Sequence, residues 1–299
     1  MVQKVFFLLA STCFFFMASA QKTKLKTVKK QIEALLDSQP GVFAVAFKDL
    51  SDGRQLYIRE HSIFHAASTM KTPVLITAYQ QAAAGKLGIN DSIAIINSFA
   101  SIADSSHFSL QASDDSETEL YQHIGEKTTL YHLLYQMIIY SSNLATNIVI
   151  QTVGAANVNA TIRAMGAKDI QVLRGVEDNK AFEKGLNNVV SAYDLCLLFE
   201  KMAKGEAVNA PASAAMIKIL LDQKFNDIIP AKLPPEVKVA HKTGWITGVH
   251  HDSGIVFLPD GRKYVLVLLS KELKDEKAGV AAMASVSELL YQYMVQKKN

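Results

Sequence analysis

Cysteine is almost absent from this chain, whose 299 residues include only Cys13 and Cys196. Cys13 lies in an apolar N-terminal stretch that has the character of a cleaved leader, so the remaining chain could form no internal disulfide. Cys196 lies in the apolar, helix-like stretch 193–199. Free cysteine is among the most buried residue types, so we interpret Cys196 as a core residue rather than a nucleophile.

The chain also lacks a strong excess of charge of either sign. Its net charge of +3 is spread along the sequence, with basic clusters only at 22–30 and at the C-terminal end. Nucleic-acid binding needs a concentrated basic surface, so that class is disfavoured. With 49% apolar and 20% charged residues, the composition is that of a folded globular protein rather than a disordered one.

Long apolar runs are missing except near the start, where Val5–Met17 follows Lys4 and precedes the small-residue sequence Ala18-Ser19-Ala20. This order is typical of a secretory signal peptide, predicted over residues 1–20. A membrane anchor is the alternative, but the run is shorter than the roughly 20 apolar residues that span a bilayer. Lipidation at Cys13 fits poorly, because Thr12 is large for the preceding position. We therefore expect a periplasmic protein, secreted across the inner membrane and free of the membrane after cleavage.

Apolar periodicity at the two ends of the chain predicts matching elements. A helical pattern from Val28 precedes two predicted strands, 42–47 and 55–58, joined by a turn. Near the other end, strands are predicted over 254–258 and 264–270, with a closing helix after residue 280. Two hairpins flanked by helices favour one antiparallel sheet built from both chain ends.

The middle of the chain has mostly helical periodicity, with weak strand signals. The predicted fold class is α+β: an antiparallel sheet flanked by helices, with an inserted all-helical lobe. A single catalytic domain over 21–299 would comprise an α/β lobe of about 23–71 and 219–299 and a helical lobe of about 72–218. The stretch 97–126, rich in serine and acidic residues, is predicted to be a long surface connection or lid.

Ser68 and Lys71 are three residues apart where a strand-like run gives way to a helical one. One helical turn brings such side chains to the same face. A serine hydroxyl is a weak nucleophile that needs a nearby base, and a lysine can be that base once burial or positive charge has deprotonated it. Alone the pattern is weak evidence, since Ser19 and Lys22 match it too.

Two further motifs follow in order, Ser141-Ser142-Asn143 after a predicted helix and Lys242-Thr243-Gly244 farther on. Together with Ser-x-x-Lys, they resemble the signature of the penicillin-recognising serine enzymes, and the class A β-lactamase superfamily in particular. The similarity extends through Phe64, 137–147 and 242–261, and covers most of the chain after the leader.

This resemblance implies a role for each motif residue. Ser68 would be acylated, with Lys71 as base or proton relay and Ser141 passing the proton to the leaving nitrogen. Asn143 would bind the substrate's side-chain amide, while Lys242 and Thr243, followed by Gly244, would attract its carboxylate from the sheet's edge strand. The N–H groups of Ser68 and Trp245 would form the oxyanion hole.

The sequence departs from the family pattern in three places. The family usually has aspartate in the middle of Ser-x-Asn, where this chain has Ser142. The deacylating base should be a glutamate before the helix predicted near residue 191, and Glu177, Asp178 and Glu183 are candidates. Glu183 is followed by Leu186 and Asn187 and so matches the family's Glu-x-x-Leu-Asn motif better. Glu177 lies at the better distance in sequence from the following helix. We prefer Glu183 slightly.

The family's carboxylate-binding arginine falls at His251, which could bind a carboxylate strongly only when protonated. A zinc site at His250-His251-Asp252 is disfavoured, because adjacent strand residues point to opposite faces. No metal and no cofactor are expected.

Three functions stay open at this point. The preferred one is hydrolysis of β-lactam antibiotics through a Ser68 acyl-enzyme. The alternatives are a D-alanyl-D-alanine carboxypeptidase or penicillin-binding esterase with slow deacylation, and a penicillin- or peptidoglycan-binding sensor. The expected partner is a small β-lactam or a cell-wall peptide, and the expected oligomeric state is a monomer.

Overall fold

A computed structural model describes residues 25–296, so the predicted leader lies outside the described residues. Within 25–296, no helix combines the length and apolar character needed to cross a membrane. The described residues begin with a helix over 25–37, which is followed by the first hairpin, β1 (Val42–Asp49) and β2 (Gln55–Ile58). The last elements are β9 (Lys238–Ile246), β10 (Val249–Phe257), β11 (Lys263–Lys271) and α10 (Glu276–Gln296).

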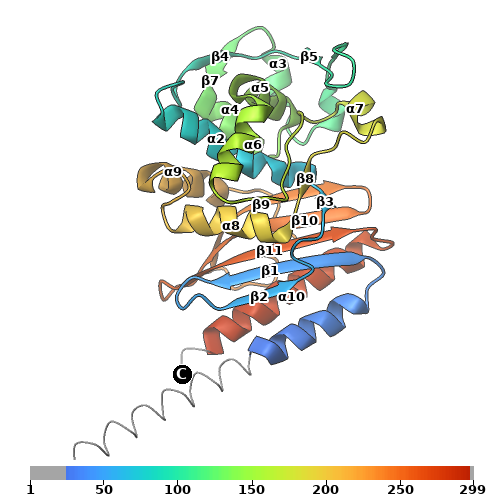
Figure 1. Cartoon of the computed structure of the whole chain (residues 1–299), viewed down its shortest axis with the longest axis vertical. Coiled ribbons are helices and arrows are strands. Elements are labelled where there is room, and N and C mark those ends of the chain that lie inside the picture. Colours follow the sequence, from blue (N-terminus) through green and yellow to red (C-terminus); the bar gives the residue numbers. More distant parts are fainter. Residues whose placement is uncertain (1–24, 297–299) are drawn as a thin grey trace, which may run out of the picture.

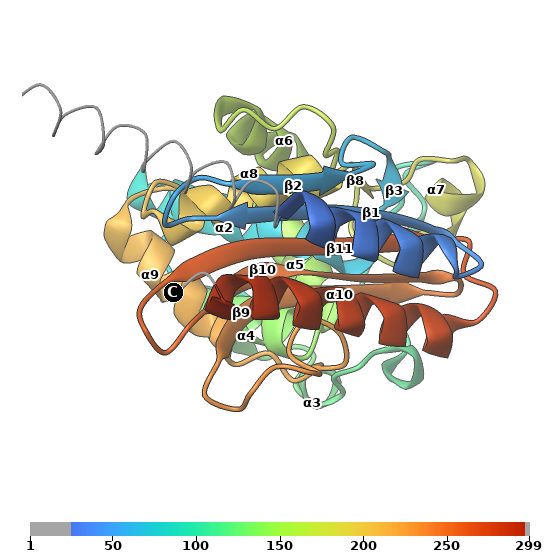
Figure 2. The same cartoon turned by 90° about the horizontal axis from the view of Figure 1, so that it is seen from below.

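These strands form one five-stranded antiparallel sheet in the order β2-β1-β11-β10-β9. The two chain ends meet where β1 pairs with β11. In Figure 1 the helix 25–37 and α10 lie together on one side of the sheet, and α8 (Ala192–Ala203) lies on the other. Figure 2 shows the helix 25–37 and α10 side by side in front of the strands. The α+β class and the sheet built from both ends are therefore confirmed.

Alternating side chains explain why this sheet is covered on both faces. In β1, Phe43, Val45 and Phe47 belong to the buried cluster that contains the α10 side chains. Ala44 and Ala46 point to the opposite cluster, which extends through the helical half of the molecule. Because side chains alternate along a strand, a continuous apolar run such as β1 must be buried on both sides.

The middle of the chain is mainly helical, as predicted. Its longer helices are α2 (Lys71–Ala83), α4 (Leu130–Ile139), α5 (Asn143–Val153), α6 (Ala155–Ala164) and α9 (Ala210–Leu221), with the short α7 (Asn179–Glu183). Short strands accompany them: β3 (Phe64–His65), β4 (Ser92–Ala94), β7 (Lys127–Thr129) and β8 (Val189–Val190). The division into two lobes stays a prediction.

The stretch 97–126 has more structure than the surface connection we predicted. It contains β5 (Phe99–Ala100), β6 (His107–Phe108), a 3₁₀ turn over Ala112–Asp114 and α3 (Glu119–Gln122). Phe99, Leu110 and Leu120 are buried in the main core. These apolar anchors are too widely spaced to give a periodic pattern, which is why the sequence indicated only a loop.

Candidate active site

Ser68 lies on a 3₁₀ turn, Ala67–Met70, that leads directly into α2. The turn is fixed from both sides: β3 pairs with β8 before it, and Met70 is buried after it. Ala67 has a positive φ of 44°, and its N–H donates to His65 Nδ1 at 3.1 Å. This tight approach leaves Ser68 partly exposed, at the wall of a cavity of about 370 Å³.

Lys71 is fully buried, and its ammonium nitrogen is surrounded by oxygens from one short segment. Lys71 Nζ donates to Ser141 O at 2.6 Å, to Asn143 Oδ1 at 3.0 Å and to Ser141 Oγ at 3.2 Å. Burial lowers the pKa of Lys71 to about 7, against the opposing effect of the Asp115 and Glu177 carboxylates. An amine with this pKa is partly neutral near pH 7, so it can accept a proton from a nearby hydroxyl.

Ser141 is the central residue of this cluster and has a left-handed backbone, with φ at 59°. It separates α4 from α5, and this conformation turns both its carbonyl and its hydroxyl toward the two buried lysines. Lys242 Nζ reaches Ser141 Oγ at 3.1 Å from the other side. A left-handed backbone conformation costs free energy for a residue other than glycine, and it persists only where the surrounding contacts maintain it.

Lys242 lies on β9, the edge strand of the sheet that faces the helical half. It is fully buried and also donates to the carbonyl of Thr243 at 2.8 Å. Burial, followed by the nearby charge of Lys71, lowers the pKa of Lys242 well below its ordinary value. The two amines on Ser141 Oγ thus form a proton path from one lysine to the other through a hydroxyl.

The sheet approaches the Ser68 turn most closely at Gly244. A Cβ there would lie 2.8 Å from Ser68 N and 2.9 Å from Thr69 N. Both contacts are with backbone atoms, which cannot rotate away as a flexible side chain can. Glycine at this position therefore permits β9 to run directly beside the candidate oxyanion donor of Ser68.

Replacing Gly244 by alanine is expected to slow acylation of Ser68 by roughly 100-fold, because the added methyl pushes β9 away from the turn and misaligns the reacting groups. The measurement is the rate of covalent labelling by a fluorescent penicillin, with thermal unfolding as the control for folding. A folded Gly244→Ala protein that labels at the wild-type rate would contradict this role.

The cavity beside Ser68 is also lined by Asn143, Glu177 and Trp245. Trp245 is 61% exposed, which is unusual for a large apolar side chain and leaves its indole available to a ligand. A second cavity, also of about 370 Å³, begins on the other side of Trp245 and includes Thr243 and His250. Trp245 thus borders both cavities.

Glu177, rather than the preferred Glu183, is the carboxylate at the site. Asn143 Nδ2 donates to Glu177 Oε1 at 3.3 Å, and Glu177 lines the Ser68 cavity. Glu183 ends α7 on the exposed side and is not among the residues lining that cavity. Leu186 and Asn187, the residues expected to support Glu183, instead accept hydrogen bonds from Arg174, at Leu186 O and Asn187 Oδ1.

Desolvation in the cavity is the largest influence on Glu177, and it raises the pKa of that carboxyl. Asp114 adds to the rise, while Lys71 and Arg174 oppose it. The loop is held by Asn147, which accepts from Val176 N at 2.7 Å and donates to Val176 O at 3.0 Å. Glu177 itself has a positive φ of 60°. A carboxylate so placed can accept a proton from a water molecule in the cavity.

Asp178, the third candidate for the base, has a structural role. It is 3% exposed, caps α7 through Ala181 N, and accepts from Ser101 Oγ at 2.7 Å and Ile102 N at 2.9 Å. The stretch 97–126 is thereby joined to the loop that carries Glu177. This connection indicates that the position of Glu177 depends on a segment far away in the sequence.

His251 cannot bind a substrate carboxylate as we expected. Its ring is fully buried, Nε2 lies 2.9 Å from the carbonyl of His65, and Ser270 N donates to Nδ1. Burial lowers the pKa of His251 to about 4, so the ring is neutral at pH 7. The neighbouring His250 points elsewhere and pairs with Glu276 at 3.0 Å.

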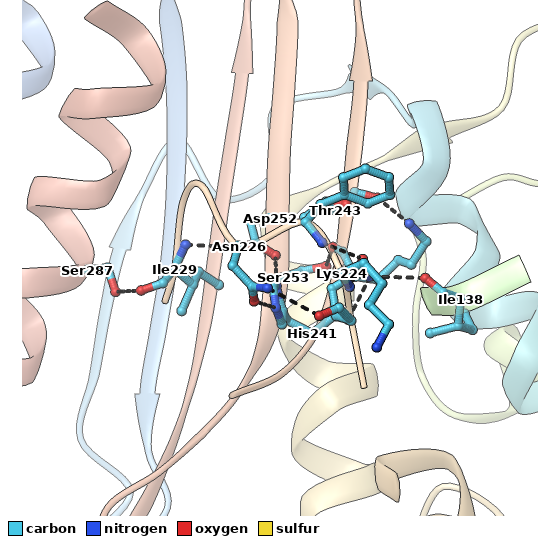
Figure 3. A network of polar contacts seen from close by, with 12 residues as sticks. Ile138, Lys224, Asn226, Ile229, His241, Thr243, Asp252, Ser253 and Ser287 are labelled. Carbon is cyan, nitrogen blue, oxygen red and sulfur yellow. Dashed lines mark hydrogen bonds and ion pairs between the residues drawn. The ribbon is translucent and has the colours of Figure 1, made fainter. Parts of the chain in front are cut away.

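A buried polar network supports β9 from behind the site, as Figure 3 shows. His241 Nδ1 lies 2.8 Å from Asp252 Oδ1, and His241 Nε2 lies 3.2 Å from Asn226 Oδ1. Asp252 also accepts from Ile229 N, whose carbonyl in turn accepts from Ser287 on α10. The network ties β9, β10, the loop 223–229 and α10 together directly beside Lys242.

The described residues 25–296 contain no cluster of three or more His, Cys, Asp or Glu residues able to hold a metal ion. Cys196 is buried, as predicted, and burial raises the pKa of its thiol to about 12. Asp115, Glu117 and Asn147 hold the site segments in place, and no sequence motif pointed to them. Two features of the sequence could have indicated these residues: the acidic composition of 114–119, and the position of Asn147 four residues after Asn143.

The site combines a turn that carries a nucleophile, two buried lysines that meet at one serine, and a carboxylate that lines the same cavity. These features define a serine hydrolase centre in an α+β fold. The chain belongs to the β-lactamase enzyme family, whose model matches residues 27–294. It is 25% identical to the extended-spectrum β-lactamase PER-1 of Pseudomonas aeruginosa over 94% of this chain and 91% of that protein.

Solved structures agree with this assignment. PBP-A superposes with a TM-score of 0.78 at 26% identity, covering 91% of this chain and 97% of that chain. A β-lactamase from Sphaerobacter thermophilus superposes with a TM-score of 0.74 at 25% identity, covering 88% and 95%. A β-lactamase from Chitinophaga pinensis, 22% identical, shares the fold with a TM-score of 0.77 over 89% and 98%.

Proposed function

We propose that this protein hydrolyses β-lactams through an acyl-enzyme on Ser68. The observation that carries the proposal is the continuous contact from Lys71 through Ser141 Oγ to Lys242, beside the partly exposed Ser68 and the cavity that Glu177 also lines. Similarity to PER-1 and to a β-lactamase from Sphaerobacter thermophilus supports the same substrate class.

In the proposed acylation, Ser68 Oγ attacks the lactam carbonyl carbon, and its proton passes to neutral Lys71. The N–H groups of Ser68 and Trp245 stabilise the oxyanion that develops. When the C–N bond breaks, Ser141 Oγ delivers a proton to the ring nitrogen and is resupplied by Lys71. Thr243 and Lys242 hold the substrate carboxylate, and Asn143 binds its side-chain amide.

In the proposed deacylation, Glu177 accepts a proton from a water molecule as the water oxygen attacks the acyl carbonyl. The tetrahedral intermediate then collapses as the bond to Ser68 Oγ breaks, and the proton that Glu177 accepted from the water returns to Ser68 Oγ, which leaves as a hydroxyl. A raised pKa makes Glu177 a stronger base than an ordinary carboxylate. Water must reach the cavity for this step, and the partial exposure of Ser68 and the exposure of Glu177 permit it.

A cell-wall D-alanyl-D-alanine peptidase is the second candidate, because it needs the same acylation residues. The buried, neutral His251 weakens the case for an antibiotic substrate, since it supplies no charge at the position where the family has the arginine that binds the antibiotic carboxylate. PBP-A, a relative at 26% identity, has a variant solved as an acyl-enzyme complex with penicillin G. We further propose, on the predicted leader, that the protein works after export to the periplasm.

The experiment that tests the proposal is intact-protein mass spectrometry at successive times after mixing with benzylpenicillin. A β-lactamase is expected to show an adduct of the penicillin's mass that clears within seconds while the drug is hydrolysed. An adduct that persists for hours would favour the peptidase instead. Complete absence of an adduct and of hydrolysis, with several penicillins and cephalosporins, would refute both.

A further inference from the structure

The N-terminus of α5 is held by a carboxylate from outside the helix. The first N–H groups of any helix lack partners within it. In α5, Asn143 N donates to both oxygens of Asp115, at 2.9 and 2.8 Å, and Leu144 N donates to Asp115 Oδ2 at 3.0 Å. Ala145 N is satisfied by Ser142 Oγ at 3.2 Å. Asp115 therefore takes two of the free N–H groups, although it lies 28 residues before Asn143.

Asp115 is itself oriented by neighbours in its own segment. Tyr121 OH donates to Asp115 Oδ2 at 2.9 Å, and Glu117 N donates to Asp115 Oδ1 at 3.3 Å. Glu117, which is 7% exposed, accepts from Ser142 Oγ at 3.4 Å and from Leu120 N at 3.2 Å. The segment 115–121 thus presents two carboxylates to the turn that carries Ser141 and Asn143.

This turn requires external support. Ser141 has a left-handed backbone, and three oxygens of Ser141 and Asn143 bind the ammonium of Lys71. A shift of the first turn of α5 would move all three oxygens at once. Ser142 lies between Ser141 and Asn143, and its hydroxyl caps the N-terminus of α5.

We propose that Asp115 positions Ser141 and Asn143 for acylation, replacing the carboxylate that the family normally has at the middle of Ser-x-Asn. This inference rests on the proposed function, because it concerns the rate of Ser68 acylation. Asp115 acts through the backbone of α5 and touches no reacting atom, so it is a positioning residue. It also explains why an ordered stretch 97–126 is packed against the site.

The charge of Asp115 provides a second, independent readout. The charged groups that affect or adjoin Lys71 are Asp115, Glu177 and Lys242, and both carboxylates raise the pKa of Lys71 against the effect of burial. Because acylation needs the neutral amine, its rate rises with pH through the pKa of Lys71. Removal of the negative charge at 115 lowers that pKa, so the acid limb of the rate profile moves to lower pH.

The test compares Asp115→Ala and Asp115→Asn with Glu119→Gln, which removes an exposed carboxylate from the same segment. Rates of labelling by a fluorescent penicillin are measured from pH 5 to 9. Asp115→Ala is expected to label roughly 100-fold more slowly at the plateau. Asp115→Asn, which keeps one acceptor oxygen, should lose less, and its acid limb should move down by roughly one pH unit. Glu119→Gln should match the wild type.

Wild-type rates in both Asp115 variants, or slower rates with an unmoved acid limb, would overturn the inference. Because folding stability itself varies with pH, the folded fraction of each variant is measured by circular dichroism at every pH, and labelling rates are compared per folded molecule. If the wild type is not labelled at all, the proposed function fails, and amide hydrogen exchange still decides the positioning. Asn143 and Leu144 should then exchange faster in both Asp115 variants than in Glu119→Gln, and equal exchange would refute the contact.

Discussion

Replacing Ser68 by alanine is expected to abolish covalent labelling by penicillins and to lower hydrolysis by roughly 10⁴-fold or more. The reason is local: Ser68 is the serine that lines the cavity beside Glu177 and Asn143. Ser141 cannot replace it, because Ser141 is only 9% exposed and its hydroxyl is hydrogen-bonded to both Lys71 and Lys242. Alanine removes the attacking oxygen and leaves the turn's backbone unchanged.

The measurement is intact mass after incubation with penicillin, followed by peptide mapping of any adduct. Ser116→Ala, which alters an exposed serine in the stretch 97–126, is the matched control and should label like the wild type. An adduct of full yield in Ser68→Ala would assign the nucleophile to another residue. Thermal unfolding of both variants shows whether each is folded.

The sequence was sufficient for the parts of the site that are carried by short contiguous motifs. Ser68 and Lys71 are near neighbours, and the Ser141 motif follows the helix that periodicity predicted, whereas Lys242 lies inside β9, a strand expected only from the family resemblance. The sheet was predictable for a similar reason, since hairpins and alternating burial are local properties. Capping of α8 by Ser191 also follows from adjacent residues, and that helix begins at Ala192 as expected.

The failures concern contacts between distant segments. Glu183 was preferred because its surrounding sequence matches the family motif. The position of Glu177, however, depends on contacts of Asn147 and on the hydrogen bond between Asp178 and Ser101. His251 was assigned by counting along the strand, whereas its environment is set by the carbonyl of His65. No periodicity or spacing rule gives such pairings, because they depend on how the elements pack.

Replacing Glu177 by glutamine is expected to trap the acyl-enzyme and slow its hydrolysis by roughly 10²- to 10⁴-fold, the usual contribution of a general base. Glutamine keeps the shape and can still pair with Asn143, so the cavity should persist. Because the Glu177 carboxylate also raises the pKa of Lys71, acylation should stay fast and its acid limb should move to lower pH. The adduct would then accumulate instead of clearing.

Glu183→Gln is the matched control for this prediction, since it makes the same change on the same loop, at the exposed end of α7. Time-resolved mass spectrometry should show the adduct clearing from Glu183→Gln as fast as from the wild type and persisting in Glu177→Gln. The reverse pattern would restore Glu183 as the base and require α7 to move in the acyl-enzyme. Persistence in all three proteins would mean that neither carboxylate activates water, because an effective base must make the wild type clear faster than its own glutamine variant.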